Sequence, residues 1–285
     1  MIQGFTSQSE KHKGLGLPIE DSFGFNSSRN IIVVADGVTR DPCVNLPPRK
    51  KEFVKNYPNP SPAAKAAEIC TKYVREFLEK KRNLTRKDVM SALWGANDKI
   101  KEWNSENMSE PDYLTRDLAG CVASACVINR SAKRLYGGYV SDCGIAILGV
   151  DGRVKFKTID EGPCKNLKQI EGIVKKHGGW NNPNARRIVR REIRNKPHCE
   201  YGDIGFGVLT GEVAALSFIK TFTRDVSSGD GVLVYSDGVE EVLFNSDGGM
   251  KSDVFRLFKS KNNKKIREYC DSKVKNEGTL VYTEI

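Results

Sequence analysis

The sequence predicts an α+β protein whose sheets are largely antiparallel, and three observations support this prediction. Runs rich in β-branched residues are typical of strands and occur at 31–36, 121–129, 134–142, 144–151, 230–237 and 279–285. Two amphipathic helix patterns lie between the first and second of these runs, and further helix material precedes the last run. An order of grouped strands and grouped helices favours this class over a regular alternation of single strands and helices.

The first predicted helix covers residues 62–81. Ser61 is a typical N-cap residue, and Pro62 fits the first helical position because its missing N–H would be unpaired there in any case. Apolar residues from Ala66 to Leu78 recur every three or four positions, which indicates one buried face.

The second predicted helix covers 85–103. Thr85 and Asp88 have the spacing of a capping box, in which the two residues satisfy each other's backbone N–H groups. An apolar stripe follows from Val89 to Trp103, and we expect both Trp94 and Trp103 to lie in the core.

Composition excludes several classes of protein. With 39% hydrophobic and 29% charged residues and 26 glycines among 285 residues, the chain is neither collagen, nor a coiled coil, nor wholly disordered. No segment approaches the roughly 18–20 apolar residues of a membrane span, and residues 1–14 lack the apolar core of a secretory signal. The eight cysteines are scattered, without metal-binding spacing. We therefore expect a cytoplasmic protein with reduced cysteines and no membrane association.

The expected organisation is a single domain over 1–285, with a flap or insertion around 152–205 that contains the basic run 185–196. The net charge of +10 favours anionic partners, which include nucleic acid, phosphorylated proteins and phosphorylated small molecules.

Carboxylates end or adjoin several apolar strands, each followed by a small residue or a turn. They are Glu20 and Asp21, Asp36 before Gly37, Asp142, and Asp237 before Gly238. Carboxylate oxygens on rigid strand ends, with glycine to permit close approach, suit a hard divalent ion. A single Asp-Gly pair is most often a turn, so the argument depends on the whole set and its order.

That ordered set resembles the PPM-type serine/threonine phosphatases, the protein phosphatase 2C family, over essentially the whole chain. The matching motifs are Glu20-Asp21, Asp36-Gly37, Ser141-Asp142-Cys143 and Ser236-Asp237-Gly238. The resemblance implies a four-layer α-β-β-α sandwich of two antiparallel sheets flanked by helix pairs, with a two-metal site at one end.

The resemblance also implies roles for individual residues. Asp36 would bridge two Mn²⁺ or Mg²⁺ ions, with the carbonyl of Gly37 and the side chain of Glu20 or Asp21 serving the second ion. Asp237 would hold the first ion, so Asp36 and Asp237 are the expected catalytic residues. Asp142 matches the site of a third, weaker ion in bacterial relatives. The reaction implied is hydrolysis of phosphoserine and phosphothreonine by a metal-activated water.

Two departures from the family pattern concern the final acid and the phosphate-binding arginine. The family's last aspartate falls on Asn276, with Glu277 beside it; an amide oxygen ligates a metal without adding negative charge. The family's arginine falls on Gly16, and Lys11, His12 or Lys13 is the expected replacement, a lysine acting as a point charge.

The run ARRIVRREIRN places arginines on one helical face, which is either a solvated surface or a contact for substrate, and we assign Arg187 and Arg190 to substrate binding. The favoured function is an active metal-dependent phosphoprotein phosphatase, expected to be a monomer. A catalytically weak PPM-fold protein that binds phosphoproteins is the alternative. Nucleic-acid binding is disfavoured because no nucleic-acid module is present.

Overall fold

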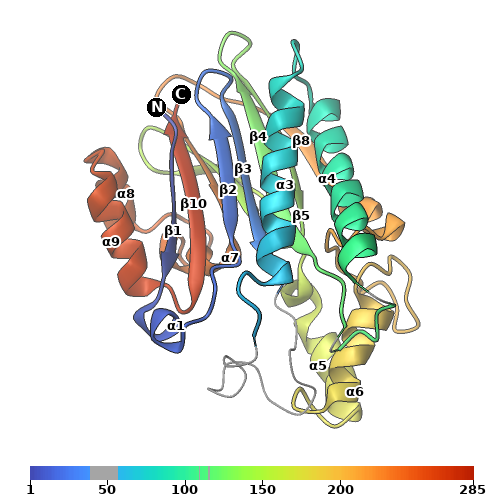
Figure 1. Ribbon diagram of the computed structural model, residues 1–285. Coiled ribbons are helices and arrows are strands. Elements are labelled where there is room, and N and C mark those ends of the chain that lie inside the picture. Colours follow the sequence, from blue (N-terminus) through green and yellow to red (C-terminus); the bar gives the residue numbers. More distant parts are fainter. Residues whose placement is uncertain (39–56, 109, 115) are drawn as a thin grey trace.

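A computed structural model describes residues 1–38, 57–108, 110–114 and 116–285, and these residues form two five-stranded antiparallel sheets (Figure 1). The first sheet has the order β1 (Gln3–Gln8), β10 (Glu277–Glu284), β9 (Gly231–Tyr235), β6 (Gly144–Leu148) and β7 (Val154–Lys157). The second has the order β2 (Ser22–Asn26), β3 (Ile31–Gly37), β4 (Cys121–Asn129), β5 (Arg134–Val140) and β8 (Lys220–Asp225).

The two sheets pack face to face, and β3 shows how. Ile32 and Val34 of β3 pack between the sheets with Val234 and Val281 of the other sheet. The alternate residues of β3, including Val33, pack on the opposite face against a helix layer. Side chains alternate across a strand, so a strand buried on both faces is apolar without interruption, as 31–35 is.

Helices cover the outer face of each sheet. α3 (Pro62–Glu79) and α4 (Arg86–Asn107) lie against the second sheet, and α7 (Asp237–Leu243), α8 (Ser252–Lys259) and α9 (Asn263–Lys273) pack on the first. The predicted α+β class and the four-layer arrangement are therefore confirmed.

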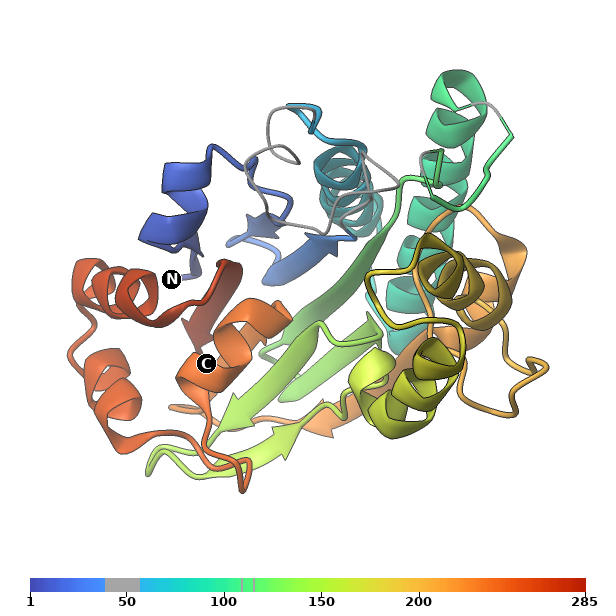
Figure 2. The same cartoon turned by 90° about the horizontal axis from the view of Figure 1, so that it is seen from below.

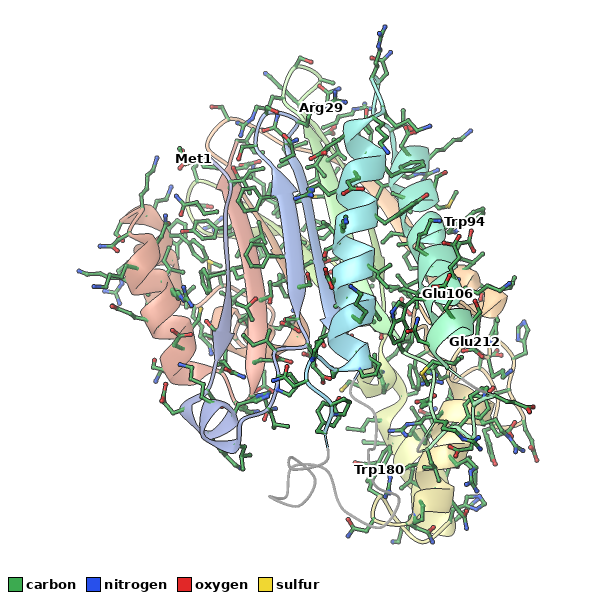
Figure 3. All side chains as sticks on the ribbon, in the orientation of Figure 1. Met1, Arg29, Trp94, Glu106, Trp180 and Glu212 are labelled. Atoms are coloured by element: carbon green, nitrogen blue, oxygen red, sulfur yellow. The ribbon has the colours of Figure 1, made fainter. Side chains whose placement is uncertain are left out.

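Both predicted helix starts are confirmed. The Ser61 hydroxyl accepts the N–H of Ala64 at 3.1 Å, and Oδ2 of Asp88 accepts the N–H of Thr85 at 2.9 Å. The prediction for Trp94 was wrong, because this side chain is 42% exposed and points away from α4 (Figure 3). Leu93 lies on the face that packs on the sheet, and the next residue is turned about 100° around the helix.

The six predicted strands are present with small shifts at their ends, but β1, β2, β7 and β8 were missed. β2 carries glycine and polar residues, and β8 is mostly polar with its residues half-buried or exposed, so neither shows the apolar pattern of an interior strand.

The segment 152–205 contributes β7 to the first sheet and then forms η1 (Pro163–Asn166), α5 (Leu167–Lys176), α6 (Pro183–Ile188) and η2 (Val189–Ile193), a single π-helical turn. α5 and α6 lie beyond one end of the sandwich, the end viewed in Figure 2. α1 (Glu10–Leu15) lies at the same end, and η3 (Val213–Phe218) precedes β8. None of the helices described in the structure is both long and apolar enough to cross a membrane.

Candidate active site

A cleft of about 1520 Å³ opens at this end of the sandwich. Among the described residues, eight carboxylates and six Lys or Arg side chains line it. The carboxylates are Glu20, Asp36, Asp142, Asp160, Asp237, Glu240, Glu241 and Glu277. Of the acids predicted from the sequence, Glu20, Asp36, Asp142 and Asp237 thus line one cleft, whereas Asp21 is not among its described lining residues.

Asp36 and Gly37 end β3 in the floor of the cleft. The backbone N–H of Gly37 donates to the carbonyl of Glu20 at 3.2 Å. A Cβ at position 37 would lie 2.6 Å from the carbonyl oxygen of Ala63 and 2.8 Å from that of Glu20. Glycine is required here because the start of α3 and the turn before β2 both press on the strand end.

Glu20 is held by the residues that lead into α3. Its Oε1 accepts the Tyr57 hydroxyl at 2.5 Å and also accepts the hydroxyl of Ser61, the N-cap of that helix. Only 5% of Glu20 is exposed. These bonds fix its carboxylate on the cleft wall.

The Asp21 carboxylate is held by Ser236, a residue of the motif Ser236-Asp237-Gly238 to which the sequence argument assigned no role. The Ser236 hydroxyl donates to Oδ2 of Asp21 at 2.7 Å and accepts the N–H of Thr279 at 2.9 Å. Oδ1 of Asp21 is buried with no hydrogen-bond partner among the described residues. Burial raises the pKa of Asp21 to about 6, although the Ser236 hydrogen bond opposes that shift. Asp21 is buried and is not among the described residues that line the cleft.

Asp142 lies in the turn between β5 and β6, where Ser141 has a positive φ of 65°. Burial, followed by the charges of Asp237 and Asp160, raises the pKa of Asp142 to about 7. A Cβ on Gly162 would lie 2.8 Å from Asp142 Oδ2 and 3.0 Å from Asp160 Oδ1, so the loop after β7 closes tightly on this turn.

Asp160 is a cleft residue that sequence reasoning missed. Its local sequence differs from that of Asp36 and Asp237, since a glutamate separates it from the next glycine. It went unnoticed because 152–205 was treated as an insertion rather than as part of the sheet.

Asp237 begins α7, and Gly238 brings that helix against the start of β10. A Cβ on Gly238 would lie 1.8 Å from the carbonyl oxygen of Glu277. Burial raises the pKa of Asp237, and a hydrogen bond with Asp36 opposes that shift. Asp237 and Asp36 are thus direct neighbours at the floor.

Glu277 faces the same carboxylates. Burial, followed by the charge of Asp21, raises its pKa to about 9. Asn276 also lines the cleft, and its backbone carbonyl accepts the N–H of Ser9 at 2.6 Å.

Asp36 is surrounded by other carboxylates of the cleft. Burial raises its pKa well above the usual value, and the charges of Asp21, Asp237, Asp142 and Glu277 raise it further in that order. Such a set of oxygen donors fits a hard divalent cation, which would compensate the repulsion. Within the described ranges, no group of three or more His, Cys, Asp or Glu side chains has the geometry of a metal site.

Of the three residues predicted to bind substrate, only Arg190 is among the described residues that line the cleft. Lys13 pairs with Glu10 at 2.8 Å on the exposed surface of α1 and is not among the described cleft residues, whereas His12 is. Arg187 donates to the carbonyl of Asp112 at 3.1 Å and is also absent from the cleft lining. Arg190 does line the cleft.

The interpretation of the arginine run as a solvated surface was wrong for Arg186 and Arg194, because both are buried. Arg194 is 3% exposed and forms a bidentate pair with Asp117, at 2.9 and 2.7 Å. Arg186 is buried, lines the cleft and donates to the carbonyl of Trp180 at 2.7 Å. Trp180 lies beside α6 at the end of the molecule where the cleft opens (Figure 3).

Comparison with known proteins identifies the fold through solved structures and not through sequence. No protein-family model and no curated protein matches the sequence. The structure is similar to the catalytic domain of the serine/threonine protein phosphatase PstP in complex with two manganese ions, with a TM-score of 0.61 at 14% identity over 100% of this chain and 97% of that one. It is also similar to the PPM Ser-Thr phosphatase MsPP from Mycobacterium smegmatis, with a TM-score of 0.58 at 14% identity over 100% and 98%.

A third solved structure, RsbX in complex with magnesium, gives a TM-score of 0.50 at 13% identity over 99% of this chain and 92% of that one. The chain therefore has the PPM-type phosphatase fold. The resemblance inferred from four short motifs is confirmed at the level of the fold.

Proposed function

We propose that this protein is a metal-dependent phosphoprotein phosphatase that hydrolyses phosphoserine and phosphothreonine. The observation that carries the proposal is Asp36, a half-buried carboxylate at the end of β3 that lines the cleft, where the charges of Asp21, Asp237, Asp142 and Glu277 all raise its pKa. A site of this kind is costly unless cations compensate it. Its solved neighbours include one phosphatase catalytic domain in complex with manganese and one protein in complex with magnesium.

The residues that would hold two Mn²⁺ or Mg²⁺ ions are Asp36, Asp237 and Glu277, together with Asp21 or Glu20 and the carbonyl of Gly37. Asp142 and Asp160 would serve a third ion. When bound, such ions acidify a water molecule and neutralise phosphate charge during in-line displacement. The expected overall reaction consumes one phosphate monoester and one water and releases an alcohol and inorganic phosphate.

The protein's own contribution is to keep oxygen donors in place on rigid elements. Ser236 orients Asp21, Ser61 and Tyr57 orient Glu20, and Gly37 and Gly238 let backbone segments approach closely. Pre-positioned donors avoid reorganisation during the reaction, which is how such sites accelerate displacement. Arg190 lines the cleft, pairs with Asp117 at 3.5 Å, and would contact an anionic substrate from the cleft wall.

The test is hydrolysis of p-nitrophenyl phosphate and a phosphothreonine peptide with Mn²⁺, with Mg²⁺ and with chelator. We expect activity only with metal, and a loss of more than about 100-fold in Asp36→Asn and Asp237→Asn. Asp225→Asn is the matched control, because Asp225 is exposed on β8. Metal-independent activity, or unchanged activity in both cleft variants, would refute the proposal.

The second candidate is a catalytically weak PPM-fold protein that binds phosphoproteins. Asn276 and Gly16, at the positions of the family's last aspartate and arginine, favour it. An inert but folded protein that retains phosphopeptide binding at millimolar Mn²⁺ would establish this candidate and exclude the first.

A further inference from the structure

Three lysines line one side of the cleft, and we call them the lysine rim: Lys251, Lys273 and Lys275. Lys251 is the N-cap of α8, Lys273 is the last residue of α9, and Lys275 lies between α9 and β10. This side of the cleft belongs to the first sheet and its helices, whereas Arg186 and Arg190 stand on the opposite, α6 side.

The backbone of the lysine rim is fixed, while its charges remain accessible. The Ser9 hydroxyl donates to the carbonyl of Lys275 at 3.0 Å, which ties this segment to the start of α1. Lys275 pairs with Glu241 at 2.5 Å, but their side chains are 77% and 76% exposed. Exposed pairs are weak and exchange partners readily, so this pairing does not remove Lys275 from use by a ligand.

Charge on the lysine rim exceeds what its neighbours compensate. Lys251 donates to the backbone carbonyl of Glu241, which leaves the carboxylate of Glu241 to Lys275. Lys273 is exposed and has no ion-pair partner in the part of the chain that the structure describes. Three positive charges therefore face two carboxylates at this edge, since Glu241 pairs with Lys275 and the charge of Lys251 helps to lower the pKa of Asp253.

The lysine rim is close to the floor of the cleft. Lys275 precedes Glu277 by two residues, which spans at most about 7 Å of extended chain. An extended peptide bound with its phosphate at the floor would place side chains one to three residues away over this edge, since each residue advances it by about 3.3 Å.

The geometry points to the lysine rim as a subsite for an anionic group that flanks the phosphorylated residue of a peptide substrate. The preferred substrates are then acidic phosphopeptides. The anionic group is either a carboxylate side chain or a second phosphate, both of which a lysine binds as a point charge. This inference rests on the proposed phosphatase function and adds the class of substrate to it.

The experiment compares three phosphothreonine peptides of equal length. One has neutral flanks, one has aspartates at the second and third positions on both sides, and one has a second phosphate at the same distance. The variant is Lys273→Glu combined with Lys275→Glu. The control is Lys264→Glu combined with Lys265→Glu, which makes the same charge change on exposed residues of α9 outside the described cleft lining.

For the wild type, kcat/KM should be higher for both anionic peptides than for the neutral one. In the lysine-rim variant, the ratio of anionic to neutral kcat/KM should fall about five- to tenfold, mainly through KM, because the contact is made in the ground state as well as in the transition state. The control should keep the wild-type ratio. A fall only for the aspartate peptide or only for the doubly phosphorylated one identifies the preferred anionic group.

An unchanged ratio in the lysine-rim variant, or an equal fall in the control, would overturn the inference. Binding of the fluorescently labelled peptides, measured by anisotropy with Mn²⁺ present, separates this outcome from failure of the phosphatase proposal. Preferential binding of anionic peptides that is lost in the lysine-rim variant, without hydrolysis, supports the subsite and contradicts the enzyme. Hydrolysis without any preference for anionic peptides supports the enzyme and contradicts the subsite.

Discussion

The carboxylate of Glu277 accepts the backbone N–H of Glu20, with both of its oxygens 3.1 Å from that nitrogen. This contact joins the start of β10 to the turn before β2, across 257 positions of the chain. It holds Glu277 beside Asp21, whose charge is the second largest cause, after burial, of the raised pKa of Glu277. Of the two residues left open for the family's final acid, Glu277 is therefore the one that brings charge to the carboxylate group.

The first prediction compares these two neighbours. Glu277→Gln should raise the Mn²⁺ concentration needed for half-maximal activity by about tenfold or more, because it removes a charged oxygen donor. Asn276→Ala should change that concentration less than about threefold. Activity with p-nitrophenyl phosphate, titrated with Mn²⁺, measures both. A larger effect for Asn276→Ala than for Glu277→Gln would mean that the Asn276 amide is the metal ligand.

The second prediction concerns how the free energy of unfolding of the metal-free protein changes with pH. The pKa is raised to about 6 for Asp21, about 7 for Asp142 and about 9 for Glu277. The folded state therefore keeps protons that the unfolded state has lost above about pH 4, so the free energy of unfolding falls as pH rises through this window. Between pH 5 and 8 it should fall by at least about 1.4 kcal/mol, the value of one pKa unit.

Urea denaturation with chelator present, at pH 5 and at pH 8, measures this fall. Asp36→Asn should make it smaller, since it removes a charge that interacts with Asp21, Asp142 and Glu277. Added Mn²⁺ should restore stability at pH 8 by mass action. Constant stability across this range in the metal-free protein would contradict the burial of these charges.

The third prediction tests the close approach of α7 to β10. Gly238→Ala should destabilise the protein by about 3 kcal/mol or more, since its Cβ would lie 1.8 Å from the Glu277 carbonyl oxygen, a backbone atom. Gly14→Ala is the control, because a Cβ there meets nothing within 4 Å and alanine favours helix α1. Denaturation midpoints compare the two, and equal effects would mean that α7 moves freely.

The fourth prediction concerns the buried ion pair between Arg194, in the arginine run, and Asp117. Asp117→Asn should cost about 3–5 kcal/mol, because it leaves the Arg194 guanidinium, 3% exposed, without its charge partner. Asp225→Asn makes the same chemical change in an exposed pair with Arg134 and should cost less than about 1 kcal/mol. Thermal denaturation measures both, and similar values would show that the Asp117 pair is solvated.

Much of the site could be predicted from local sequence. An acid placed directly after an apolar strand is carried to the strand end whatever the rest of the fold does, so Asp36, Asp142 and Asp237 were found from their own neighbours. Asp160 and Ser236 were not, because their roles come from contacts with Asp142 and Asp21 that no local pattern encodes.

The arginine run shows the same division. Its spacing predicted a helix, and residues 183–193 are helical, although the last turn is a π-turn. Whether each arginine meets solvent, a carboxylate or the cleft depends on partners such as Asp117, which lies 77 positions from Arg194 in the sequence.

The sequence by itself determined the α+β class, six of the strands, the two helices over the second sheet and the acids at their strand ends, because periodicity and capping act over a few residues. Only the tertiary structure decided that Glu277 joins these acids, that Lys13 and Arg187 stand outside the described cleft lining, and that three lysines edge the cleft. Burial and charge depend on which distant segments pack together, and the antiparallel pairing of β1 with β10 and of β2 with β3 fixes that packing.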